Sequence, residues 1–253
     1  MPRAIQFDPT ASFSTQNIDS TTSYTYAYFS FDTNLNETLH GRSTTTAGSP
    51  SVSTTTKKFG AGSAALHSSY IKINNSQNAA AFAGEFTIQF FIYFNSLSGN
   101  YVGPIGAHYN GGWLMQIKNN QSRFYINGSN QILSSTPPST GQWVHIAVTR
   151  DSSNVVRFFL DGSLLGSITY TAALPTNNDI YIGASNQTGQ NVSGYMDDVL
   201  IADGICLYTG AFTPPTTASG GSVPTTVTDT RSYTSVFDLR TQYKERAAGN
   251  WPT

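Results

Sequence analysis

The sequence has almost none of the covalent or apolar features that stabilise exported or membrane proteins. Cys206 is the only cysteine, so no disulfide can form within the chain. No stretch approaches the roughly 18 consecutive apolar residues of a membrane-spanning helix. The opening residues, MPRAIQFDPT, also lack the apolar core of a signal peptide. We therefore expect a chain that is made and folded in a cytoplasm and contacts no membrane.

Charged side chains are scarce as well. They make up 11% of the chain, against about a quarter of an average globular protein. The formal net charge of −1 provides no overall field that would attract nucleic acid. Aromatic residues reach 13%, which suits strands that are polar on one side and aromatic on the other. The composition therefore favours a β-rich protein that does not bind nucleic acid.

Only three glutamates occur, Glu37, Glu85 and Glu245, and they lie far apart in sequence. A retaining glycosidase needs two carboxyl groups about 5–5.5 Å apart, and no Glu-x-Asp-x-Glu run places such a pair on one strand face. Asp197 and Asp198 are adjacent, so we expect them to point to opposite sides of a strand. The sequence therefore predicts that the protein is not an enzyme.

The alternation of apolar residues predicts an all-β domain. In residues 85–94, EFTIQFFIYF, five apolar side chains share one face, and Thr87, Gln89, Phe91 and Tyr93 share the other. Such a run would aggregate at a sheet edge, so we expect a central strand. Further strands are expected at 25–32, 143–149, 155–160, 180–184 and 195–201, with turn signals such as Asp161-Gly162 between them. The predicted core comprises Phe86, Ile88, Phe90, Val144, Ile146, Val148, Phe158 and Leu160.

These patterns divide the chain into three parts. Residues 1–24 form an expected N-terminal arm, 25–216 an antiparallel jelly-roll sandwich, and 217–253 a flexible linker with a short helical tail. A purely flexible tail would have no reason to keep large apolar residues. We therefore expect the tail to dock on a partner protein or a second copy, with its own sandwich as the alternative. The docking residues are expected to be Phe237, Leu239, Tyr243 and Trp251.

Seven motifs resemble, in order, those of the laminin-G-like, concanavalin-A-like domains. They are TYAYFSFD, KKFGAGSAAL, EFTIQFFIYF, GQWVHIAVTR, FFLDGSLLGS, DIYIGAS and GYMDDVLIADG. Phe91 stands where the family usually has Trp. The resemblance covers residues 25–216 and implies a jelly-roll sandwich, but this fold serves lectins, glucanases, adhesion modules and virion proteins alike.

A narrower resemblance concerns the end of that region. DGICLYTGAFTPPT is similar to the closing Arg-Tyr-x-x-x-Phe-x-Pro-Pro motif of laminin-G-like domains in tailed-bacteriophage virion proteins, with Leu207 in place of the Arg. LRTQYKERAAGNWP also resembles C-terminal tails of phage structural proteins. The resemblance implies a non-enzymatic virion structural protein, in a capsid decoration, tail or fibre. It implies other virion proteins and further copies of the chain as partners. The alternative is an adhesin module that binds host-surface glycan.

A glycan site requires exposed aromatic rings beside amide and hydroxyl groups. The loop at 100–113, NYVGPIGAHYNGGW, supplies Tyr101, His108, Tyr109, Asn110 and Trp113. In the alternative interpretation, which we favour, Trp113 begins a core strand and the tyrosines cover its edge. The sequence thus provides a candidate site and a structural explanation for the same residues.

Relatives implied by the resemblance often bind Ca²⁺ at the rim of the sandwich through carboxylate and carbonyl oxygens. The candidates here are Asp32, Asp179, Asp197 and Asp198. Alternatively, the resemblance implies that the adjacent pair Asp197 and Asp198 ties strand ends to loop amides, and no cofactor is expected. His145 shares a strand face with Trp143, so we expect a hydrogen-bonded structural role for its ring.

Overall fold

The computed structural model describes residues 24–74, 82–97, 101–108, 111–175, 179–185 and 190–222, with the side chains of 129–131 excepted. The predicted N-terminal arm, apart from Tyr24, and the docking residues Phe237, Leu239, Tyr243 and Trp251 lie outside these ranges, as does the expected helix. Among the described residues, no helix is long and apolar enough to cross a membrane.

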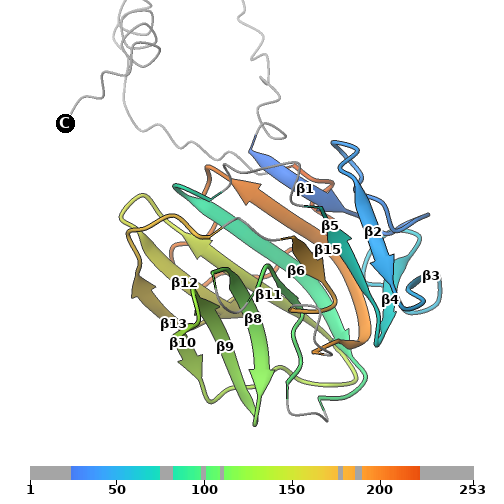
Figure 1. Cartoon of the computed structure of the whole chain (residues 1–253). Coiled ribbons are helices and arrows are strands. Elements are labelled where there is room, and N and C mark those ends of the chain that lie inside the picture. The colour runs from blue at the N-terminus through green and yellow to red at the C-terminus, as the bar shows by residue number, and fades with distance from the viewer. Residues whose placement is uncertain are drawn as a thin grey trace, which may run out of the picture.

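The described chain is an all-β sandwich of two antiparallel sheets that lie face to face (Figure 1). Sheet A contains, in spatial order, β13 (Ser163–Thr169), β12 (Val155–Leu160), β11 (Trp143–Arg150), β6 (Phe86–Phe94), β15 (Ser193–Asp203), β4 (Ser63–His67) and β3 (Ser51–Ser53), with β1 (Thr25–Phe29) also paired to β15. Sheet B contains β10 (Ser129–Ser134), β9 (Gln121–Ile126), β8 (Trp113–Lys118), β7 (Ile105–Gly106), β14 (Ile180–Ile182), β5 (Tyr70–Ile73) and β2 (Thr44–Ala47).

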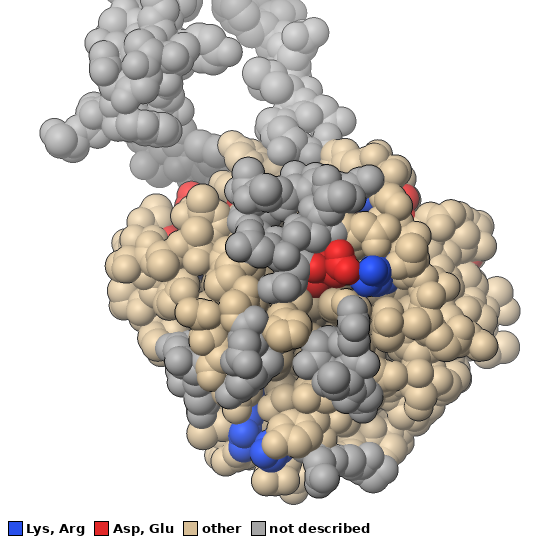
Figure 2. Space-filling view, in the orientation of Figure 1, with Lys and Arg blue, Asp and Glu red and all other residues tan. Residues whose placement is uncertain are grey.

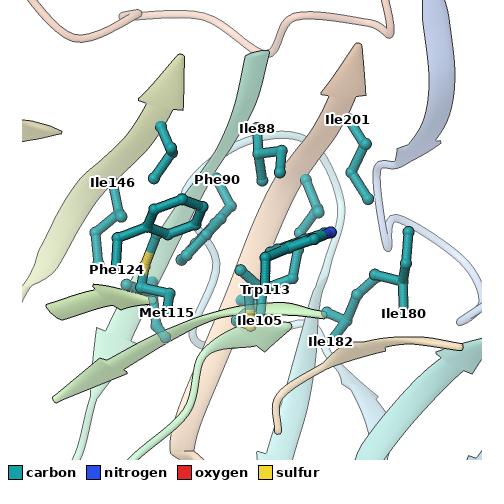
Figure 3. Close-up of a cluster of buried hydrophobic side chains, with 14 of the residues drawn as sticks. Ile88, Phe90, Ile105, Trp113, Met115, Phe124, Ile146, Ile180, Ile182 and Ile201 are labelled. Atoms are coloured by element: carbon teal, nitrogen blue, oxygen red, sulfur yellow. The ribbon is translucent and has the colours of Figure 1, made fainter. Parts of the chain in front are cut away.

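The core lies between the two sheets, as alternation along the strands predicts. Every residue of the predicted core is buried. Ile88 and Phe90 of β6 point toward Trp113, Met115 and Phe124 of sheet B (Figure 3). β6 pairs with β11 on one side and β15 on the other, so the prediction of a central strand is confirmed.

A segment after β15, residues 204–222, runs back across the outer face of sheet A, and we call it the strap. Ile205 and Leu207 pack on Tyr28 and Leu200. Further along the strap, the backbone N–H of Phe212 donates to the carbonyl of Gly162, 3.0 Å away. The hydroxyl of Thr25 donates to the carbonyl of Gly221 at 2.7 Å. Residues 217–222, which the sequence assigned to the flexible linker, therefore lie against the sandwich.

A second cover is the loop at residues 57–62, which we call the covering loop. Phe59 lies against Phe91 of β6, with ring centroids 5.0 Å apart. Gly60 has a positive φ of 52°, and a Cβ there would lie 2.0 Å from Oδ1 of Asp32. Only glycine fits so close to that carboxylate, which explains the Phe-Gly step in the sequence.

Candidate functional site

Of the glycan site predicted in the loop at 100–113, the structure describes Tyr101, His108 and Trp113, and these three residues do not come together. Trp113 is fully buried in the core, 6.1 Å from the ring of Phe82 and 6.3 Å from that of Phe124 between centroids. It cannot contact a ligand, so its assignment to a glycan site is wrong. The alternative interpretation, a core strand beginning at this residue, is the one that the structure supports.

Tyr101 and His108 are exposed, but they lie at opposite ends of β8. At the end of β8, the ammonium nitrogen of Lys118 lies 4.1 Å from the centroid of the Tyr101 ring. At the start of β8, the backbone N–H of His108 donates to the carbonyl of Trp113. At about 3.4 Å per residue, the two ends of this six-residue strand are about 17 Å apart. Tyr109 and Asn110 lie outside the described residues. The structure thus separates Tyr101 from His108, which the sequence grouped.

Asp197 and Asp198 point to the same side of sheet A, so the expectation of opposite sides is wrong. A bulge interrupts the pairing of β15 with β6 at this point, and Asp198 has a φ of 49°. As a result, Met196 and Val199 both enter the core, and the two residues between them face outward. A β-bulge adds one residue and so breaks the simple alternation.

The carboxylates of Asp197 and Asp198 hold the covering loop and the strap against sheet A. Asp197 accepts the backbone N–H groups of Lys58 and Phe59 at 2.8 and 3.0 Å. Asp198 accepts the hydroxyl of Tyr28 and the backbone N–H of Ser219, each at 2.9 Å. Burial raises the pKa of Asp197 to about 6, although these amide bonds act in the opposite direction. Burial likewise raises the pKa of Asp198.

The structure does not bring the four candidate calcium ligands, Asp32, Asp179, Asp197 and Asp198, together at one point. Asp32 accepts the backbone N–H groups of Ala61 and Gly62. Asp179 lies on the other sheet and forms an ion pair with Lys72, with 2.9 Å between nitrogen and oxygen. No group of three or more His, Cys, Asp or Glu that could hold a metal ion occurs in the described part of the chain. Asp197 and Asp198 accept backbone N–H groups of loops, which is the alternative that the sequence left open for this pair.

His145 lies beneath the strap and differs from the prediction. Its ring lies 4.7 Å from that of Phe91 and 5.6 Å from that of Phe212 between centroids, and the residue is 1% exposed. Neither ring nitrogen has a hydrogen-bond partner among the described residues, so the expected hydrogen-bonded role is wrong. Burial, with a smaller contribution from the charge of Lys58, lowers the pKa of His145 to about 3. The imidazole is therefore neutral.

One row of rings on this face keeps partial exposure. Trp143 and Tyr195 are each directly opposite Tyr93, on the neighbouring strands β11 and β15. The ring centroids are 5.8 Å apart for Trp143 and Tyr93, and 6.0 Å for Tyr93 and Tyr195. His67 of β4 extends the series at 5.4 Å from Tyr195. We call these four residues the aromatic row. The three aromatic side chains are half-buried and His67 is exposed.

The strap and the covering loop both stop short of the aromatic row. Phe212 of the strap packs on His145, and Phe59 of the covering loop packs on Phe91. His145 and Phe91 are the neighbours of Trp143 and Tyr93 on the same strand faces, two residues along. Lys58 stands at this boundary, with its ammonium nitrogen 4.8 Å from the centre of the Phe91 ring. The arrangement supplies apolar ring faces, hydroxyl and N–H groups, and one cation along a border.

The sequence contained part of the signal for this row. Tyr93 was placed on the outward face of a central strand, and Trp143 on a face opposite to core residues. Outward positions of a solvent-facing strand are usually polar, so large rings there were informative. Their approach to Tyr195 depends on which strands are neighbours and in which register, and single-strand patterns do not contain that information.

Comparison with known proteins agrees with this architecture. The family profile described as the concanavalin A-like lectin/glucanases superfamily, of laminin-G type, matches residues 62–206, more than half of the chain. The chain therefore belongs to this family. No curated protein shows a significant sequence match.

Solved structures of low sequence identity share the fold. Domain 4 of AbnA, a GH43 extracellular arabinanase from Geobacillus stearothermophilus solved with arabinotriose, has a TM-score of 0.57 at 16% identity, over 77% of this chain and 97% of that domain. The botulinum neurotoxin serotype D binding domain has a TM-score of 0.57 at 16% identity, over 73% of this chain and 49% of that one. The serotype D ligand binding domain with N-acetylneuraminic acid has a TM-score of 0.56 at 15% identity, over 77% and 49%. This chain thus spans about half of the neurotoxin structures.

Proposed function

We propose that this domain binds carbohydrate without catalysis and that the aromatic row is its contact surface. The observation that carries the proposal is the row of Trp143, Tyr93 and Tyr195, whose half-buried rings lie side by side on the outer face of sheet A, next to the strap and the covering loop. Such rings bury large apolar area at low entropic cost and keep a polar edge for hydrogen bonds. Sugars offer both an apolar C–H face and hydroxyl groups, so they match this surface.

The structural neighbours support the same class of ligand. The AbnA domain was solved with arabinotriose, and a serotype D neurotoxin domain with N-acetylneuraminic acid. Similar folds that bind different sugars favour glycan recognition here without naming the sugar. Charged residues are few in the chain as a whole, at 11%, and little of the described face that Figure 2 shows carries Lys, Arg, Asp or Glu. This composition agrees with a contact surface made mainly of rings and uncharged polar groups.

The described carboxylates support a role without catalysis, because they have structural partners. Glu37 accepts backbone N–H groups of Tyr28, Leu39 and His40. Asp151 accepts two backbone N–H groups in its turn and pairs with Arg157 at 2.6 Å. Asp197 and Asp198 are buried beneath the covers. An acid and a nucleophile would both have to reach the substrate.

A glycan array followed by calorimetry tests the proposal. We expect wild-type protein to bind at least one glycan class, and Trp143→Ala to weaken that binding by at least about tenfold, as for a central aromatic contact. Tyr101→Ala is the matched control, because this exposed tyrosine belongs to the other sheet and should leave affinity unchanged. Chelation of divalent cations should also have no effect. Unchanged affinity in a folded Trp143→Ala variant, or no glycan bound by wild type, would refute the proposal.

A second candidate function is that of a virion component, assembled in a host cytoplasm. The sequence resemblance to phage proteins at residues 203–216 favours it. Within that motif, Tyr208 and Phe212 stack with 3.5 Å between centroids and close the outer face of sheet A. The shared motif would therefore reflect a shared way of covering this sandwich. A glycan-binding domain and a particle component are compatible, because an adhesin can be part of a particle.

Immunogold labelling of purified particles tests the virion role. We expect label at a fixed position on particles from cells that express the full chain. A variant that lacks residues 231–253 should stay folded but fail to join particles, if the tail docks on other virion proteins. Label absent from all particles, or a truncated chain that joins them normally, would contradict this assignment.

A further inference from the structure

One side of the sandwich ends in two strands that have only one partner each among the described strands. β13 is the last strand of sheet A and β10 the last of sheet B. The two lie against each other, on the side opposite to β2 and β3 (Figure 1). A Cβ at Gly166 of β13 would lie 3.0 Å from Cγ2 of Ile132 of β10, so the two sheets approach closely there. Each strand therefore leaves a row of backbone N–H and C=O groups open on the same side.

These edges lack the side chains that usually prevent association. Neither SLLGSIT nor SNQILS, the sequences of β13 and β10, contains a charged residue or a proline. Leu133 and Leu164 are each 47% exposed, the highest values among the large hydrophobic residues that the structure describes. The opposite side is protected by shortness, because β3 has three residues and β2 has four. Charge, proline and short length are the common means of blocking an edge.

Each open edge contains one bulge. The pairing of β13 with β12 shifts at Leu165, and the pairing of β10 with β9 shifts between Asn130 and Ile132. Both bulges lie near the level at which Ile132 approaches Gly166. Bulges protect an edge by twisting it. Beyond its bulge, however, each strand keeps regular pairing, over residues 166–169 in β13 and 132–134 in β10.

We propose that this side is an interface between two copies of the chain, with β13 paired to β13 and β10 to β10 about a twofold axis. The number of open edges determines the partner. A single extended peptide would pair with one of the two edges and leave the other unpaired. A second copy offers two edges with the same separation and hydrogen-bonding pattern, as isologous contacts require. Because neither β13 nor β10 contains a charged residue, pairing each strand with its own copy places no like charges opposite each other.

Light scattering and sedimentation of the full chain test this interface. Wild type is expected to be dimeric, and the double variant Leu133→Lys, Leu164→Lys to lose at least about tenfold in association constant, since lysines block edges. Leu39→Lys is the matched control, because Leu39 is another exposed leucine, at 36%, and lies beside Gly221 of the strap. The control should remain dimeric. A monomeric wild type, or a folded double variant as dimeric as wild type, would overturn the proposal.

Hydrogen exchange on the wild type decides the matter if the double variant fails to fold. Amides of β13 and β10 should become more protected as protein concentration rises, while those of β2 and β3 should not change. Protection that is independent of concentration at β13 and β10 would also refute the interface. This test involves no glycan and is independent of the proposed function.

Discussion

Replacing His145 with phenylalanine tests whether the strap covers sheet A as described. The imidazole is almost fully buried, and neither of its nitrogens has a partner among the described residues. An unsatisfied buried polar group costs about 1–3 kcal/mol. Its neighbours Phe91 and Phe212 already form an aromatic environment. We therefore expect His145→Phe to raise the free energy of unfolding by about 1–3 kcal/mol at about pH 7.5.

The effect should grow as the pH falls. The pKa of His145 is about 3 in the folded chain, and that of an unperturbed histidine is about 6.5. Between these values the unfolded chain binds a proton that the folded chain does not, so wild type loses stability as the solution becomes more acidic. At about pH 5 the loss is about 2 kcal/mol, from about 1.4 kcal/mol per pH unit. The Phe variant lacks this loss.

The carboxylates act in the opposite direction and must be subtracted. The pKa of Asp197 is raised by burial to about 6, so the folded chain binds a proton before the unfolded chain does. This contribution stabilises the fold below about pH 6 and is lost as the pH rises through that value. In wild type it offsets much of the His145 effect. Both proteins contain Asp197, so the difference between their pH profiles isolates His145.

Urea unfolding of both proteins at several pH values measures this difference. We expect the gap in unfolding free energy between His145→Phe and wild type to widen by about 2 kcal/mol from about pH 7.5 to about pH 5. His108→Asn, which changes an exposed histidine, is the control and should follow the wild-type profile. A gap that stays constant with pH would show that the His145 ring is solvated in the folded state. The description of the strap as a cover would then be wrong.

Three further substitutions test the core and the attachment of the strap. Phe90→Ala removes a fully buried ring between the sheets and should lower unfolding free energy by about 3–5 kcal/mol in urea titrations; a loss below about 1 kcal/mol would contradict the core assignment. Asp198→Ala removes the acceptor of Tyr28 and Ser219 and should destabilise by about 2–4 kcal/mol, with faster hydrogen exchange in the strap; unchanged exchange there would count against an anchoring role. Gly162 has a φ of 75°, and its Cβ would lie 1.8 Å from the carbonyl oxygen of Phe212. Gly162→Ala should therefore weaken strap protection, and a variant with wild-type exchange and stability would disprove that close contact.

Much of the fold could be predicted because strand patterns are local. The alternation in residues 85–94 predicted which side chains of β6 are buried, and all of its inward set lies in the core. Turn signals such as Asp161-Gly162 similarly predicted hairpins, because a positive φ at those positions favours these residue types.

The candidate sites were predicted less well because they depend on register and on covers. The loop around Trp113 offered both a glycan site and a core strand, and the structure has the favoured core strand, whose inward face packs on Phe82. Asp197 and Asp198 looked like alternating strand residues, yet one bulge turned both outward. Neither outcome follows from residue type or spacing, since a bulge is an irregularity in the pairing of two strands.

The sequence by itself determined the class of fold, the order of the strands along the chain and, where strand pairing is regular, which face of a strand enters the core. These properties follow from periodic burial, which each segment expresses on its own. Only the tertiary structure decided which outward residues meet solvent. Pairing of β11, β6 and β15 brought Trp143, Tyr93 and Tyr195 into one row, and the strap covered the neighbouring His145 but ended before them. Exposure is a property of everything packed around a residue, so it emerges only when distant segments are in place.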